Sequence, residues 1–213
     1  MSRVKIVKAK RVRRKPDAVR SDALQAARRL LLKSGPEAIT LPAVAKELGM
    51  AHGNITHHFG SVAALHASLV DQMARELAAA VLSAVGQLRD GEAKPVEVVD
   101  AVFNAFADRG AGRLISWLAS TGNMKALEPL FSSIARMVRD LSTSTPKLNE
   151  RQKLLIRQNA LTLLATGFGN AVIGDLLHIA VGLPAATLNQ LSTKDILRRI
   201  YPSRKSHAGR GRD

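Results

Sequence analysis

The chain has 213 residues, with 32 Lys and Arg against 17 Asp and Glu, and its formal net charge is +15. This length allows one large domain or two small ones, and 46% hydrophobic residues is typical of a folded chain. The absence of cysteine excludes a disulfide framework, a thiolate zinc site and cysteine catalysis. The charge favours a polyanionic partner, either nucleic acid or an anionic membrane.

The positive charge is concentrated at the two ends of the chain. Residues 1–20 hold nine basic residues against one acidic residue, and residues 194–213 hold seven against two, so the ends carry +8 and +5. No apolar segment follows the basic N-terminus as in a secretory signal. The longest uncharged segments, residues 158–174 and 176–193, fall short of the roughly 20 apolar residues of a membrane span. We expect a cytoplasmic protein that does not bind membranes.

Almost everything after residue 16 has helical periodicity, and no segment alternates as a strand should, so the expected fold class is all-α. Asp17 or Ser21 can cap a first helix that runs to about Lys33, before the helix-ending Gly35-Pro36. Leu24, Ala27, Leu30 and Leu31 form its apolar stripe.

Two short helices follow, joined by a tight glycine turn. Thr40 is expected to cap a helix over 41–48, and Gly49 supplies the turn. A second helix covers about 51–58, anchored by Ile55 and Phe59, and Ala45 is small where the two helices must cross. This is the pattern of a helix-turn-helix unit, whose second helix enters the DNA major groove.

A long amphipathic helix is predicted over 62–88. Further helices are predicted at about 95–108, 112–120, 124–142, 150–181 and 185–200, separated by glycines and prolines.

Within the first part of the chain, the sequence resembles the tetracycline-repressor (TetR) family of bacterial transcription regulators. The resemblance is carried by the helix over 24–32 and by three segments, Gly35-Pro36-Glu37-Ala38-Ile39-Thr40, Val44-Ala45-Lys46-Glu47-Leu48-Gly49 and Gly53-Asn54-Ile55-Thr56-His57-His58-Phe59-Gly60-Ser61. It implies a basic flexible arm (1–16), a three-helix DNA-binding domain (17–65, motif 40–59), a larger helical regulatory and dimerisation domain (66–200) and a basic tail (201–213).

The resemblance also implies which residues touch DNA. These are Thr40, Ala51, His52, Gly53, Asn54, Thr56, His57, His58 and Ser61. Ala51, Thr56 and Val62 stand where the family usually has Ser, Tyr and Lys, so some phosphate contacts are lost. We expect the arm to offset them through Lys10, Arg11, Arg13, Arg14 and Lys15, in the minor groove or on the backbone.

The histidines of this region also allow a different interpretation. His52, His57, His58 and His66 suggest a metal site, but His57 and His58 diverge by about 100° on one helix and nearby acidic residues are sparse. We expect no metal and no cofactor. The Asn54 side chain can form hydrogen bonds with adenine in the major groove, although an exposed asparagine is often simply solvated. Gly53 has no side chain and would allow the backbone to approach DNA closely.

Two further sets of candidates lie in the second part. The effector-pocket candidates are Phe103, Phe106, Arg113, Trp117, Met124, Phe131 and Phe168, with ordinary core packing as the alternative. The dimer-interface candidates are Leu164, Gly167, Ala171, Gly174, His178, Leu188 and Leu191, with an internal bundle core as the alternative.

By resemblance, we expect a ligand-responsive repressor that binds double-stranded DNA as a homodimer on a pseudo-palindromic operator, its recognition helices about 34 Å apart. The effector would be a small molecule. A non-regulatory, nucleoid-associated DNA-binding protein on the same fold is the main alternative. An enzyme or small-molecule carrier is less favoured, because no nucleophile–base pair, carboxylate dyad or phosphate loop is present, and we expect no catalytic residues.

Overall fold

The computed structural model describes residues 16–107, 110–143 and 148–200, and all regular structure in these ranges is helical. The α-helices are α1 (Pro16–Ser34), α2 (Leu41–Glu47), α3 (His52–Phe59), α4 (Val62–Arg89), α5 (Pro95–Phe106), α6 (Ala111–Ser120), α7 (Glu128–Thr143), α8 (Glu150–Val181) and α9 (Thr187–Ile200). Short 3-10 helices cover Pro36–Ala38 and Met124–Leu127. The predicted all-α fold is confirmed.

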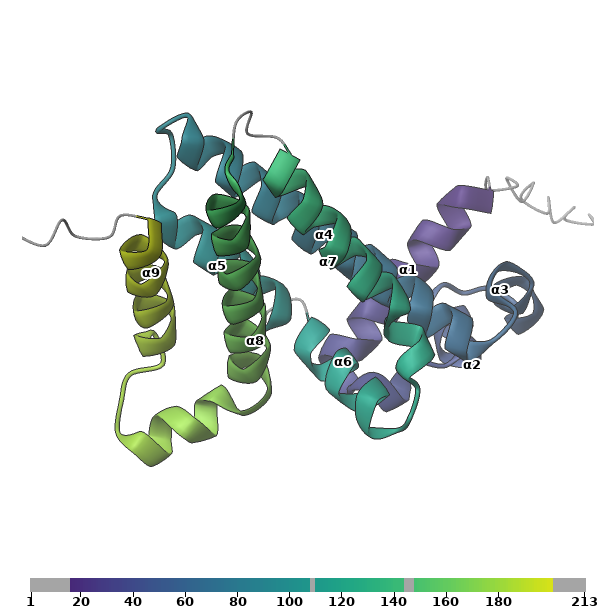
Figure 1. Ribbon diagram of the computed structural model, residues 1–213. Helices are drawn as coiled ribbons and strands as arrows, with labels where there is room; N and C mark the ends of the chain where they lie inside the picture. Colours follow the sequence, from purple (N-terminus) through teal and green to yellow (C-terminus); the bar gives the residue numbers. More distant parts are fainter. Residues whose placement is uncertain (1–15, 108–109, 144–147, 201–213) are drawn as a thin grey trace, which may run out of the picture.

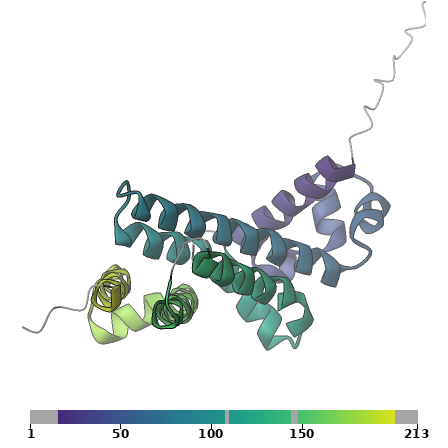
Figure 2. The same cartoon turned by 45° about the horizontal axis from the view of Figure 1, so that its top comes forward.

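Helix α4 connects the two parts of the molecule. Figure 1 shows α1, α2 and α3 gathered at one end, and α8 and α9 towards the other. α4 packs against α1 and α3 near its start, and against α5 and α7 along the rest of its length. Figure 2 shows the same arrangement from a second direction, with α4 and α7 side by side. One continuous helix therefore belongs to both parts, and the buried side chains of the two parts form one connected core.

Most of the predicted helix limits hold to within two residues, with two differences. The first helix begins at Pro16, so the prediction that Asp17 or Ser21 is its N-cap was wrong, since both lie inside the helix. The segment predicted as one helix over 124–142 is a 3-10 helix followed by α7. Pro129 is the second residue of α7, where its missing N–H is not needed, so the proline marks a helix start.

The N-terminal helices pack around fully buried aliphatic side chains. Leu31, Ile39, Val44, Ile55 and Leu65 are buried almost completely and come from α1, the α1–α2 connection, α2, α3 and α4. Full burial of each such side chain contributes about 1.5–3 kcal/mol to folding. This core fixes the position of α3 relative to the other helices.

In the larger part, small residues allow α8 to approach α5 and α6 closely. A Cβ added to Gly112 of α6 would lie 2.8 Å from the Cβ of Ala171. A Cβ added to Gly167 would lie 3.2 Å from Val102 of α5. One stripe of α8 is thus buried inside its own chain.

Candidate nucleic-acid interface and ligand cavity

Local capping and turn geometry set the angle between α2 and α3. Thr40 precedes α2 in extended conformation, and its Oγ1 accepts a hydrogen bond of 3.2 Å from the Ala43 N–H, which confirms it as the N-cap. Gly49 has φ of 62°, in the left-handed region that glycine adopts without strain. Ala45 is buried at the crossing of the two helices, where a larger side chain would push them apart. The helix-turn-helix geometry predicted from these residues is present.

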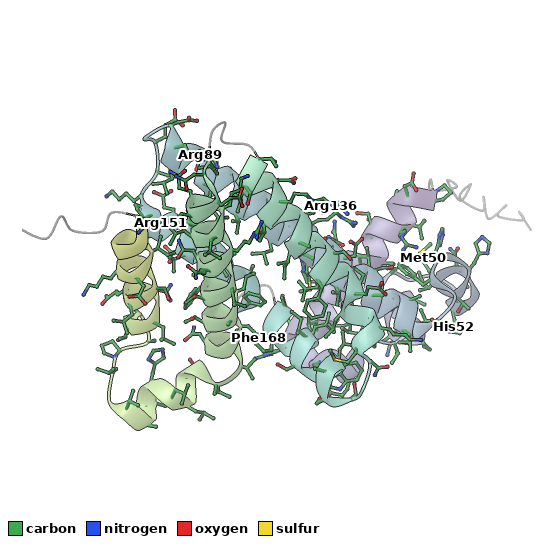
Figure 3. All side chains as sticks on the ribbon, viewed as in Figure 1. Met50, His52, Arg89, Arg136, Arg151 and Phe168 are labelled. Atoms are coloured by element: carbon green, nitrogen blue, oxygen red, sulfur yellow. The ribbon has the colours of Figure 1, made fainter. Side chains whose placement is uncertain are left out.

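Helix α3 has one buried face and one exposed face. Ile55 and Phe59 point into the core, whereas the DNA-contact candidates His52, Gly53, Asn54 and His57 are exposed. Figure 3 shows His52 projecting from the surface at this end of the molecule. The exposed residues offer hydrogen-bonding groups of the kind that read base edges in the major groove.

The other predicted DNA contacts have roles within the fold. The Thr56 hydroxyl donates to the His52 carbonyl oxygen at 3.1 Å, and the Ser61 Oγ accepts from the Ala64 N–H at 3.1 Å as the N-cap of α4. Ala51 precedes α3 without a side-chain cap, and His58 is half-buried. The basic arm candidates Lys10, Arg11, Arg13, Arg14 and Lys15 lie outside the described residues.

Arg20 holds the recognition helix in place, a role that the sequence analysis missed. From α1, its guanidinium donates to the His58 carbonyl oxygen at 3.0 Å and to the Ser68 Oγ at 2.7 Å. The guanidinium also lies 4.7 Å from the centre of the Phe59 ring. Arg20 thus ties the C-terminal end of α3 to α1 and α4. In the sequence it is one of nine basic residues in a charged segment, and nothing local distinguishes it.

An apolar cavity of about 140 Å³ lies among α4, α5, α7, α8 and α9. Its walls are formed by Val81, Val85, Leu88, Arg89, Pro95, Val98, Val102, Met137, Leu141, Ile156, Asn159, Ala160, Leu163, Leu164 and Ile196. Arg89 and Asn159 are the two polar residues among them. The Arg89 guanidinium donates to the Leu141 carbonyl oxygen at 3.3 Å, so it lies against α7 at the end of α4.

The predicted effector-pocket residues lie elsewhere, and their role stays a prediction. Phe106 lines a small void of about 10 Å³ beside α4 and α6, Phe103 is buried, and Phe168 packs edge-on against Phe106. Trp117 packs edge-on against His66. Arg113, Met124 and Phe131 are exposed. The 140 Å³ cavity is lined mainly by aliphatic residues, and none of the described lining residues is aromatic. In the sequence, such residues at helical spacing are indistinguishable from ordinary core.

The predicted dimer residues mostly pack inside one chain. Gly167, Gly174 and His178 are buried, Ala171 contacts α6 near Gly112, and Leu164 lines the cavity. On α9, Leu188 is half-buried and Leu191 is exposed. The internal-core alternative therefore describes the glycine stripe of α8.

The opposite side of α8 is apolar and exposed. Leu161, Leu176 and Ile179 expose 73%, 71% and 79% of their surface, and Val172, Ile173 and Leu177 are also exposed. By length and composition α8 is long and apolar enough to cross a membrane, which is weak evidence, and 17% of its most apolar window is buried in the chain. Apolar residues on both sides of α8 explain this composition. We call the exposed side the outer face of α8.

Within the described ranges, no three His, Asp or Glu side chains are grouped as metal ligands would be.

The geometry defines an all-helical class of protein, with a helix-turn-helix unit at one end and a larger set of helices at the other (Figure 1). Residues 23–69 match the model of the "Bacterial regulatory proteins, tetR family". This segment thus resembles the family at the helix-turn-helix unit, and the chain as a whole is similar in fold to solved structures that include a TetR family transcriptional repressor. No curated protein matches the chain in sequence.

Solved structures are similar in fold over most of the chain. The multidrug binding protein EbrR, complexed with imidazole, is 18% identical, with a TM-score of 0.59 over 84% of this chain and 93% of that one. A protein with unknown function from Rhodococcus sp. RHA1 is 19% identical, with a TM-score of 0.57 over 90% and 98%. Thermus thermophilus FadR, a TetR family transcriptional repressor in complex with lauroyl-CoA, is 19% identical, with a TM-score of 0.51 over 90% and 100%.

Proposed function

We propose that the protein is a TetR-family repressor that binds a pseudo-palindromic operator as a homodimer and releases it when a small molecule occupies its larger domain. The observation that carries the proposal is α3, which is fixed on one side by Ile55 and Phe59 and exposes His52, Asn54 and His57 on the other. Rigid support of a polar helix face is what major-groove reading requires.

The domain division of the proposal is a DNA-binding domain over 17–65 and a regulatory domain over 66–200. The division falls within α4, whose first turns pack on α1 and α3. In this proposal the arm over 1–16 adds phosphate contacts, because it is basic and directly precedes α1. We expect the protein to be cytoplasmic, because the DNA that it would bind lies there.

The homodimer is supported by the outer face of α8. Large contiguous apolar surfaces on a folded chain mark protein contacts or membrane contacts. The charged Asp175, exposed within the same stretch, favours a protein contact, since a charge in hydrocarbon is costly. A two-fold contact of two such faces would bury them on both subunits and pair two recognition helices.

Ligand response is supported by the 140 Å³ cavity, which is close in size to apolar cavities that bind benzene. A ligand shifts an equilibrium only if its affinity differs between two states. Since α4 both lines the cavity and contacts the DNA-binding helices, its position can differ between a free and a bound state. The solved relatives EbrR and FadR carry imidazole and lauroyl-CoA, which is consistent with small-molecule binding on this fold.

The proposal predicts sequence-specific binding that depends on Asn54. Genomic fragments selected by the full chain should bind at least about 10³-fold more tightly than random DNA at the same salt concentration. Asn54→Ala should weaken that binding by about ten- to a hundredfold, because a bidentate base contact contributes about 1–3 kcal/mol. The exposed Gln158→Ala on α8 is the control and should leave affinity unchanged.

Two results would contradict this proposal. A specificity ratio near one would favour the nucleoid-associated alternative. Selected complexes that survive addition of every fraction of a metabolite extract would contradict ligand response.

A further inference from the structure

The polar side chains in the wall of the 140 Å³ cavity are already engaged within the protein. The Arg89 guanidinium donates to the Leu141 carbonyl oxygen at 3.3 Å and has a further interaction within the chain, and Asn159 also interacts with other groups of the protein. We propose that this cavity takes an uncharged, apolar molecule, with one six-membered ring or a hydrocarbon chain of similar size. This inference rests on the proposed ligand response and names the class of ligand for that site.

The apolar walls match such a molecule in chemistry and in size. Apart from Arg89 and Asn159, every described residue of the wall is aliphatic, proline or methionine. These side chains offer dispersion contacts, and an apolar cavity holds no ordered water that a ligand would have to displace. An engineered protein cavity of about 150 Å³ binds benzene, so this cavity of about 140 Å³ has room for one ring with at most a small substituent.

An anion would lose more in this cavity than it gains. Its carboxylate would leave water, which is costly unless the charge is paired and hydrogen-bonded. Arg89, the one cation among the described residues of the wall, is exposed, and the hydrogen bond to Leu141 holds its guanidinium against α7. A guanidinium that is both solvated and already engaged adds little affinity for an anion.

The wall has equally little to offer a cation. Among its described residues there is no acidic side chain and no aromatic ring, the two kinds of group that attract a bound cation. Asp195 lines an adjoining hollow instead, with Thr162, Thr166 and Ser192, and is itself exposed. The cavity therefore selects against charge of either sign.

The experiment compares three probes that share one ring and differ in charge. Toluene, benzoate and benzylammonium are titrated into the full-length protein at neutral pH, by isothermal titration calorimetry. Toluene should bind at least about a hundredfold more tightly than either ion, because only the ions must give up the hydration of a charge to enter the cavity. Equal or tighter binding of benzoate or benzylammonium, or no binding of toluene up to its solubility, would overturn the inference.

Substitutions at Ala160 test the location. Ala160→Phe fills the cavity from α8 and should abolish toluene binding. The smaller change Ala160→Val should weaken it by about tenfold, through the room that two methyl groups occupy. Ala79→Phe is the matched control, because Ala79 is exposed on α4 and does not line the cavity. Thermal unfolding checks that each variant is folded, and toluene binding that is unchanged in the folded Ala160 variants would contradict the location.

The two proposals fail separately. Toluene that binds in the cavity without changing affinity for the selected DNA supports the apolar site and contradicts ligand response. Release of DNA by a charged ligand, lost in Ala160→Phe, supports ligand response and contradicts the uncharged class.

Discussion

His66 is a single side chain that joins the two parts of the molecule. It lies on α4 and is buried, and its Nε2 donates to the Ile39 carbonyl oxygen at 3.1 Å, next to the α2 cap Thr40. On the other side, the Trp117 ring of α6 packs edge-on, with centroids 5.2 Å apart. Burial lowers the pKa of His66, and the hydrogen bond to Ile39 offsets part of this effect. His66 is therefore neutral in the folded protein over a wider pH range than an exposed histidine.

This lowered pKa predicts a pH dependence of stability. Because the unfolded chain takes up the His66 proton at about pH 6.5 and the folded chain only at lower pH, the free energy of unfolding should fall as the pH drops below about 6.5. His66→Gln should reduce that loss, measured by urea unfolding at pH 7.5 and 5.5. The same substitution at the exposed His52 is the control. Equal pH dependence in wild type and His66→Gln would contradict the role of His66.

At the scale of one element, different residues of α3 serve folding and DNA binding. Its buried residues Ile55 and Phe59 fix it to the domain, whereas the surroundings of Gly53 are open, with no atom within 4 Å of an added Cβ. The fold alone does not require glycine at position 53. We infer that close approach to DNA requires it.

Gly53→Ala should therefore have opposite effects on stability and on DNA affinity. Alanine favours a helix over glycine by up to about 1 kcal/mol, so the unfolding midpoint should rise or stay level. Affinity for the selected operator should fall by about tenfold or more if the backbone approaches DNA here. The measurements are thermal unfolding and DNA titration at one salt concentration. Gly86→Ala on α4, also open, controls for the substitution itself.

Sequence patterns predicted the helices well, because each depends on nearby residues. Thr40, Gly49 and Ala45 determine the helix-turn-helix geometry within ten residues of one another, so the motif could be located without a structure. The role of Arg20 could not be predicted, since its partners His58 and Ser68 are 38 and 48 residues away. Periodicity also could not distinguish the two apolar sides of α8, because both repeat at helical spacing.

At the scale of the whole molecule, the outer face of α8 predicts that the protein is dimeric. Leu176→Arg places a charge on a residue that exposes 71% of its surface in one chain, so the monomer should fold normally and the dimer should dissociate. Sedimentation velocity should show a shift from dimer to monomer at micromolar concentration. The control is Gln25→Arg, an exposed polar residue on α1, away from the outer face of α8. An unchanged dimer in Leu176→Arg would contradict this interface.

Because α4 is long, a small tilt at its cavity end moves its other end by a distance comparable to the spacing of DNA base pairs. At about 1.5 Å per residue, its 28 residues extend about 42 Å, with Arg89 at one end and the Ser61 cap at the other. A tilt of about 5° about the cavity end would move the other end by about 4 Å, roughly the rise of one base pair. A ligand that tilts α4 only slightly would thus change the separation of the two recognition helices of a dimer. Their separation would then no longer match that of the two half-sites in the DNA.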